Sequence, residues 1–181
     1  MIIAETDRLV VTTFSLADLD EIAPIMADPD VMRFTVGGPW DRERTQQFLR
    51  KCIENYSHEG WRFGLWALVH KADGRLVGYC GLSRLGNIDG APEVELSYRL
   101  SRDHWGGGLA TEAASKVRDY AFEHIGLTRL ISMIEPDNIA SIRIAEKIGM
   151  RREKEIENRE RRMLVYSTTH DSGSRWPDLE R

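Results

Sequence analysis

The sequence has little cysteine and no clustered histidine. Its two cysteines, Cys52 and Cys80, lie far apart and lack the spacing of metal ligands. Its five histidines, at positions 58, 70, 104, 124 and 170, include no pair at ligand spacing. These absences exclude a disulfide framework and lead us to expect no metal site. They favour two reduced core cysteines in a cytoplasmic protein.

The sequence also lacks a long apolar run and an excess of basic residues. No segment is apolar over the roughly 20 residues that a membrane-spanning helix needs. Residues 1–5 have neither the basic nor the apolar region of a signal peptide. The net charge of −4 gives no reason to expect nucleic-acid binding, which depends on basic surface. We therefore expect neither a membrane nor a nucleic acid as partner, while monomer and homodimer both stay open.

What is present is typical of one globular domain. The chain has 181 residues, of which 41% are hydrophobic and 30% charged. Alternating apolar residues and turn signals predict strands at 8–14, 61–70, 75–85, 93–100, 127–134, 150–157 and 161–169. Apolar residues at helical spacing predict helices at 15–27, 41–56, 109–121 and between Asp137, as its cap, and Gly149. We expect an α+β domain at 1–169, with helices on the faces of a mixed sheet, and a polar tail at 170–181.

The most informative segment joins the strand at 93–100 to the next helix. Three consecutive glycines, Gly106, Gly107 and Gly108, precede Leu109. The first amides of a helix have no internal partner, and the aligned peptide dipoles leave partial positive charge there. Glycine has no Cβ atom and permits positive φ, so main-chain N–H groups can approach an anion closely. The segment therefore predicts a cradle for a diphosphate.

Other interpretations of the glycines stay open. A glycine triplet on its own is more often a flexible turn. A Walker phosphate loop is excluded because no Gly-Lys-Ser/Thr follows. The dinucleotide fingerprint fits poorly, because Thr111 stands where that motif needs a small residue. Glu135 could nevertheless imitate the ribose-binding acid of that motif.

The segment 105–113 resembles the acetyl-CoA diphosphate motif of the GNAT acetyltransferases, written Gln/Arg-x-x-Gly-x-Gly/Ala. Gly108 and Ala110 match this motif. Trp105 stands where most of the superfamily has Gln or Arg, but tryptophan is usual in the branch of ribosomal-protein N-terminal (alanine/serine) acetyltransferases. Segments 6–9, 94–100 and 135–150 are also similar to that branch, so the resemblance covers roughly residues 5–169.

The resemblance implies a central twisted mixed sheet that splays after its fourth strand. The pantetheine arm of acetyl-CoA would lie in this opening. A bulged region near residues 98–100 would offer main-chain groups to the arm, much as an added strand does.

The resemblance also implies roles for single residues. Glu95 would be the catalytic base, acting through water, although a solvent-facing strand carboxylate is the plainer interpretation. Asn138 would bond the pantetheine arm and Ser141 would hold or protonate the CoA sulfur. Without that role, they are a helix cap and a small exposed residue. The implied cofactor-binding residues are Tyr98, Arg99, Leu100, Trp105, Gly106, Gly107, Gly108, Leu109, Ala110, Thr111, Asn138 and Ser141.

Two further groups are weaker candidates. Arg102, Lys116, Arg143 and Lys147 are candidate partners of the CoA phosphates, although each on its own is more typical of a solvated surface charge. The aromatic residues that could wall the acceptor pocket, or belong to the core, are Phe34, Trp40 and Trp61.

We therefore expect an acetyl-CoA-dependent N-acetyltransferase without a metal ion, which acetylates a primary amine by direct attack in a ternary complex. The acceptor could be a protein N-terminus or a small molecule. An α-amine has an ordinary pKa of about 7.7–8.0 against about 10.4 for lysine, so a weak base would favour it. A non-catalytic CoA-binding regulatory module and a nucleotide-binding domain are the alternatives.

Overall fold

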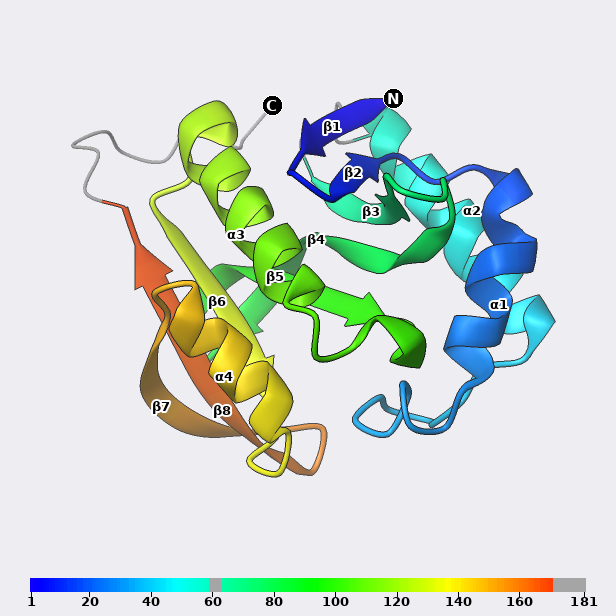
Figure 1. The fold of residues 1–181 in the computed structure, drawn as a ribbon. Coiled ribbons are helices and arrows are strands. Elements are labelled where there is room, and N and C mark those ends of the chain that lie inside the picture. Colours follow the sequence, from blue (N-terminus) through cyan, green and yellow to red (C-terminus); the bar gives the residue numbers. More distant parts are fainter. Residues whose placement is uncertain (59–62, 171–181) are drawn as a thin grey trace.

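A computed structural model describes residues 1–58 and 63–170, which form one eight-stranded sheet with helices on both sides (Figure 1). The strands are β1 (Ile2–Glu5), β2 (Leu9–Thr12), β3 (Gly64–His70), β4 (Leu76–Ile88), β5 (Ala91–Leu100), β6 (Arg129–Ile134), β7 (Arg151–Asn158) and β8 (Arg161–Thr169). The helices are α1 (Leu19–Ala27), α2 (Arg42–His58), α3 (Leu109–Tyr120) and α4 (Ile139–Lys147).

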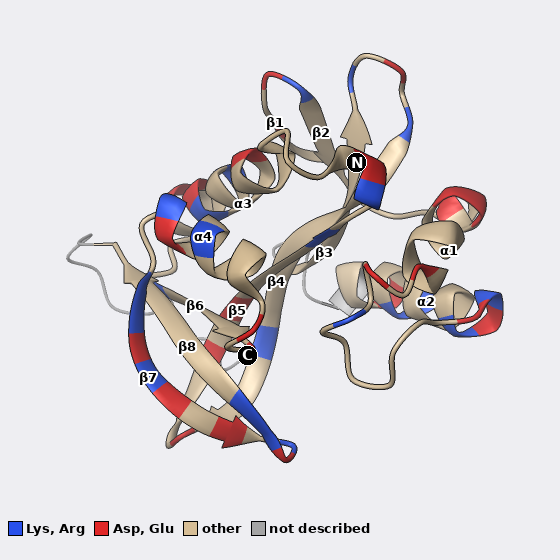
Figure 2. Ribbon diagram, turned by 60° about the horizontal axis from the view of Figure 1, so that its bottom comes forward, with Lys and Arg blue, Asp and Glu red and all other residues tan. Residues whose placement is uncertain are grey.

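The sheet has the strand order β1-β2-β3-β4-β5-β6-β8-β7. Among the described strands, β5 and β6 form the parallel pair and all other neighbours are antiparallel. Helix α3 connects β5 to β6, as the crossover of a parallel pair requires. Helices α3 and α4 cover one face of the sheet, and α1 and α2 cover the other (Figure 1 and Figure 2).

The core follows from the amphipathic pattern of the helices. Helix α1 buries Ile22 and Met26 completely, and α3 buries Ala113, Ala114 and Val117. Small residues on α3 let its backbone approach the sheet closely. At the far end of α3, the Tyr120 ring packs edge-on against the fully buried Trp66 of β3, with ring centroids 5.6 Å apart.

The predicted fold class is confirmed, and three details of the prediction need correction. Strand β1 was not predicted, because four residues are too few to show a pattern. The turn expected at 87–92 is tighter: Asp89 and Gly90, both with positive φ, join β4 to β5. No bulge occurs near residues 98–100, since the β4–β5 register is unbroken from Gly78↔Leu100 to Ser83↔Glu95.

The sheet splays after β5, which is the predicted fourth strand. Strands β5 and β6 share one residue pair, Glu95↔Ile131. Just before this pair, the Arg129 guanidinium forms a bidentate contact with Glu93, at 3.0–3.1 Å. Arg129 also contacts Glu153 of β7 at 2.8 Å, so one guanidinium connects β5, β6 and β7 at the base of the splay.

We expect Arg129→Met to destabilise the fold by about 3 kcal/mol, because Glu93, 8% exposed, would keep a buried charge without its partner. Arg162→Met serves as the control, because Arg162 pairs with Glu155 on the surface, where such a pair contributes about 1 kcal/mol or less. Urea unfolding of both variants measures the two losses. Equal losses would contradict a structural role for the Arg129 contacts.

Candidate active site

Beyond Glu95, the main chain of β5 no longer pairs with β6. Ser101 N–H donates to Val77 O at 2.8 Å. The main-chain N–H and C=O groups of the odd-numbered residues of β5 therefore bond to β4, and those of the even-numbered residues point toward β6. The Leu96 carbonyl accepts from the buried Ser132 hydroxyl at 2.7 Å, and the Leu100 carbonyl accepts from Trp105 Nε1 at 2.9 Å. Between them, the N–H and C=O of Tyr98 face the gap without a ladder partner. An extended ligand could bond to these groups as an added strand does.

Glu95 lies where the two strands separate. Its carboxylate accepts the Met133 N–H of β6 at 3.3 Å, in place of a main-chain acceptor. Burial raises the pKa of Glu95 from its ordinary 4.5 to about 7, and the Met133 hydrogen bond opposes this rise. A carboxylate with this pKa can accept a proton near neutrality, which is the property of a general base. Glu95 is half-buried rather than fully exposed to solvent, and its role as the base stays a prediction.

The start of α4 brings Tyr98, Asn138 and Ser141 together. Asn138 Oδ1 accepts the Ser141 N–H at 3.2 Å, so Asn138 caps α4, and the prediction that Asp137 does so was wrong. On the side facing α4, Tyr98 Oη donates to the Ser141 carbonyl at 3.1 Å. These two bonds use the main chain of Ser141. Its side chain also hydrogen-bonds to Tyr98, which opposes the rise that burial causes in the Tyr98 pKa. Sequence spacing correctly placed Asn138 and Ser141 on one face.

The glycine segment forms an uncapped helix start. Gly106 and Gly108 have φ of 77° and 81°, and Gly108 is the N-cap of α3, with no side chain to bond the first amides. A Cβ atom added at Gly106 or Gly107 would meet no protein atom within 4 Å. The glycine segment therefore has open space beside it, and the first amides of α3 have no side-chain cap, as an anion cradle requires.

Sequence reasoning missed the side chains that hold this segment in place. Arg8 donates from Nη1 to Gly107 O at 2.9 Å and from Nε to Glu112 at 2.7 Å. The Arg8 main chain also donates to Glu112 at 3.0 Å. The similarity of residues 6–9 to the family was a signal for Arg8, but nothing in the sequence indicated its partner on α3.

Helix α3 follows β5 and α4 follows β6, so both helices begin at the same end of the two parallel strands (Figure 1). This end carries two exposed apolar side chains, Trp105 on the segment before α3 and Ile139 at the first position of α4. The gap, the uncapped amides of α3 and these apolar surfaces together fit a ligand with an extended arm and an anionic group. That combination matches the pantetheine and diphosphate of CoA.

The weaker candidates have other surroundings. Arg102 pairs with Asp30 rather than facing the gap. Trp40 packs edge-on against Phe48 of α2, with ring centroids 5.5 Å apart. The guanidinium of Arg161 binds the proposed ribose-binding Glu135, which removes the support for a dinucleotide site. Three of the candidates are exposed: Lys116, Arg143 and Lys147. Phe34 is half-buried, and Trp61 lies outside the described residues.

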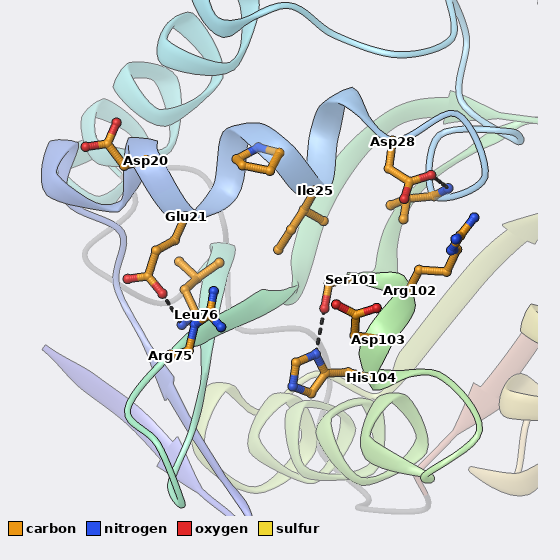
Figure 3. Close-up of a pocket in the computed structure, with 12 residues that line it drawn as sticks. Asp20, Glu21, Ile25, Asp28, Arg75, Leu76, Ser101, Arg102, Asp103 and His104 are labelled. Carbon is orange, nitrogen blue, oxygen red and sulfur yellow. Dashed lines mark hydrogen bonds between the residues drawn. The ribbon is translucent and has the colours of Figure 1, made fainter.

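A cavity of about 310 Å³ lies on the other side of the turn that leads to the glycines, between this turn and α1 (Figure 3). Its polar lining is largely engaged within the protein: Glu21 accepts the Leu76 N–H at 2.8 Å, and Ser101 Oγ contacts His104 Nδ1 at 2.7 Å. Of the residues predicted to act in catalysis or cofactor binding, the cavity contains only the weaker candidate Arg102, which pairs with Asp30. We therefore place the site at the β5–β6 gap.

Comparison with known proteins agrees with this geometry. The model of the acetyltransferase (GNAT) domain family matches residues 8–151. The Bacillus subtilis protein YkkB is 35% identical over 139 residues, which are 77% of this chain and 78% of that protein. A GNAT-family acetyltransferase structure from Bacillus anthracis has a TM-score of 0.80 at 24% identity and covers 93% of this chain and 98% of its own.

A structure of the ribosomal-protein α-N-acetyltransferase RimL in complex with coenzyme A has a TM-score of 0.77 at 12% identity. The alignment covers 94% of this chain and 99% of RimL. The chain belongs to the GNAT family of acetyltransferases. It is accordingly an N-acetyltransferase.

Over 1–58 and 63–170, no group of three or more His, Cys, Asp or Glu side chains could hold a metal ion. In the same part of the chain, no helix is long and apolar enough to cross a membrane.

The raised pKa of Glu95 predicts a pH dependence of stability. The folded protein keeps a proton on Glu95 that the unfolded chain loses near pH 4.5, so this stabilisation is complete below pH 4.5 and is lost as pH rises through about 7. We expect Glu95→Gln to flatten the fall in stability across this window. Urea unfolding at about pH 5 and about pH 7.5 tests it. Glu123→Gln, a surface control, should keep the wild-type slope, and the same slope in Glu95→Gln would contradict burial of this carboxyl.

Proposed function

We propose that the protein transfers an acetyl group from acetyl-CoA to a primary amine by direct attack in a ternary complex. The observation that carries the proposal is the half-buried Glu95, which lies where β5 and β6 separate and has a pKa raised to about 7. One domain at residues 1–169 would hold the whole site. The two cysteines are free and buried, which supports a cytoplasmic enzyme.

The chain's own groups fit acetyl-CoA at three places. The amides at 106–111 would hold the diphosphate, because the N-cap glycine leaves them uncapped. The free N–H and C=O of Tyr98 would bond the pantetheine arm, and Asn138 Nδ2 remains available for it because the cap uses Oδ1. Trp105 serves a different role in this scheme, since its indole holds the Leu100 carbonyl.

Acetyl-CoA supplies an activated acyl group, and the protein supplies position and proton transfer. Glu95 takes the proton that the amine loses, through a water molecule, as the nitrogen–carbon bond forms. When the carbon–sulfur bond breaks, a proton returns to the sulfur, and the Ser141 hydroxyl is our candidate to hold or protonate that sulfur. Met133 N–H keeps the Glu95 carboxylate oriented for this exchange.

The resemblance of residues 6–9, 94–100 and 135–150 to the branch of ribosomal-protein N-terminal acetyltransferases supports an α-amine as acceptor, on a protein N-terminus or a small molecule. A base with pKa near 7 also suits an α-amine better than a lysine amine, whose ordinary pKa is about 10.4.

We expect Gly108→Ala to weaken CoA binding roughly tenfold or more, because a side chain at its φ of 81° strains the helix start whose amides form the cradle. Gly126→Ala is the control for backbone strain: its φ is 82°, its added Cβ meets no protein atom within 4 Å, and it lies at the other end of the helix. Calorimetric titration with CoA compares the variants. Unchanged affinity in a folded Gly108→Ala protein would refute the cradle.

We expect the wild type to release free thiol from acetyl-CoA with at least one member of an amine panel, and kcat/KM to rise with pH through an apparent pKa near 7. Glu95→Gln should lower kcat by about a hundredfold or more and leave CoA affinity intact. Ser141→Ala tests the second role in the same assay. Full turnover in Glu95→Gln would remove Glu95 as the base, and no release with any amine would contradict the proposed function.

A further inference from the structure

Arg99 is a half-buried cation on β5 whose recorded contacts are with neutral groups. Its guanidinium donates to the Thr35 hydroxyl in the segment between α1 and α2, and its Cζ lies 5.6 Å from the centroid of the Tyr79 ring. Among residues 1–58 and 63–170, no carboxylate forms an ion pair with Arg99. The group has therefore lost part of its hydration without gaining a counter-ion, which is unfavourable unless a ligand supplies one.

Arg99 and Glu95 emerge on the same face of the sheet. They are four residues apart on one strand, and side chains at i and i+4 of a strand point the same way. Tyr79, the cross-strand partner of Arg99, packs against Phe48 of α2 with ring centroids 5.7 Å apart, so this is the face that α1 and α2 cover. Tyr98 points to the opposite face, toward α4. A molecule that presents its amine to Glu95 therefore approaches from the side of Arg99.

We propose that Arg99 binds a carboxylate of the acceptor, and that the acceptor class is amines that also carry a carboxylate. The inference rests on the proposed function and names its substrate class. A guanidinium has five N–H donors in a planar fork that matches a carboxylate, and the Thr35 contact leaves most of them free. Arg99 would repel the distal positive charges of a polyamine, so polyamines fall outside the class.

The carboxylate can come from a free amino acid or from an acidic side chain near a peptide N-terminus. The Cα atoms of Glu95 and Arg99 are roughly 13 Å apart along the strand, and both side chains shorten that span. A series of ω-amino acids of increasing length therefore locates the amine-to-carboxylate separation that the site accepts. Peptides amidated at the C-terminus, with aspartate or asparagine as second residue, test the peptide source.

The test compares kcat/KM for each carboxylate acceptor with that for its amide, in the wild type and in Arg99 variants. We expect the wild type to prefer one carboxylate over its amide by roughly tenfold to a hundredfold, as a charge-assisted hydrogen bond would give. Arg99→Gln should bring this ratio close to one, mainly through KM, and Arg99→Lys should restore part of it. Spermidine should be a poor acceptor.

Two control variants separate recognition from a structural role. Thr35→Val removes the contact with Arg99 and keeps the charge, so the preference should persist. Arg33→Gln removes an equal charge from an exposed position of the same segment, and this variant should also keep the preference for the carboxylate acceptor. The proposal fails if the wild type shows no preference, if spermidine is the best acceptor, if Arg99→Gln keeps the preference, or if Thr35→Val abolishes it.

Calorimetry makes the inference testable apart from catalysis. With CoA present, the wild type should bind the preferred carboxylate amine more tightly than its amide, and Arg99→Gln should not distinguish them. Turnover of neutral amines without this difference in affinity overturns the inference and leaves the acetyltransferase intact. The difference in affinity without any thiol release supports Arg99 recognition and counts against the proposed reaction instead.

Discussion

The ladder between β5 and β6 ends after one residue pair, and the geometry of the site follows from that ending. Parallel strands normally continue to exchange main-chain hydrogen bonds, and unpaired N–H and C=O groups inside a protein are costly. Here two side chains replace the missing ladder bonds. The Ser132 hydroxyl donates to the Leu96 carbonyl, and the Glu95 carboxylate accepts the Met133 N–H. The strands can then separate without leaving these buried groups unpaired, and Tyr98 presents its main chain to the gap.

The same separation gives two ionic groups the different environments that acyl transfer needs. Glu95 is half-buried at the point where the strands separate, so desolvation raises its pKa toward neutrality and it can exchange a proton there. The diphosphate of CoA needs the reverse, a site where charge is favoured, and the uncapped start of α3 supplies positive potential beside open space. At the base of the splay, Arg129 holds β5, β6 and β7 together. This contact fixes the strands that position Glu95 and the start of α3.

The sequence predicted the parts of this arrangement that depend on local pattern. The α+β fold, the helix after the glycines and the splay after β5 are confirmed, because apolar periodicity, glycine chemistry and the family resemblance each bear on them. The cap of α4 was assigned one residue too early, since Asp137 and Asn138 are both good caps and local propensity does not choose between them. The expected bulge near residues 98–100 is absent, because the gap arises from the loss of β6 as a partner instead.

The remaining features are contacts between residues distant in the chain, which no local pattern reveals. Arg8 meets Glu112 more than a hundred positions away, and Ser132 meets Leu96 across two strands. The assignments of single residues to cofactor and catalysis stay predictions, and the geometry refines them by separating the main-chain role proposed for Tyr98 from the structural bond of Trp105.

Amide hydrogen exchange with and without CoA tests the central claim most directly, because it reads the main-chain groups on which the account depends. The account predicts that CoA slows exchange at Tyr98 and at the amides of 106–111, with little change at the cavity beside α1. Saturating CoA that protects neither Tyr98 nor the start of α3 would contradict it.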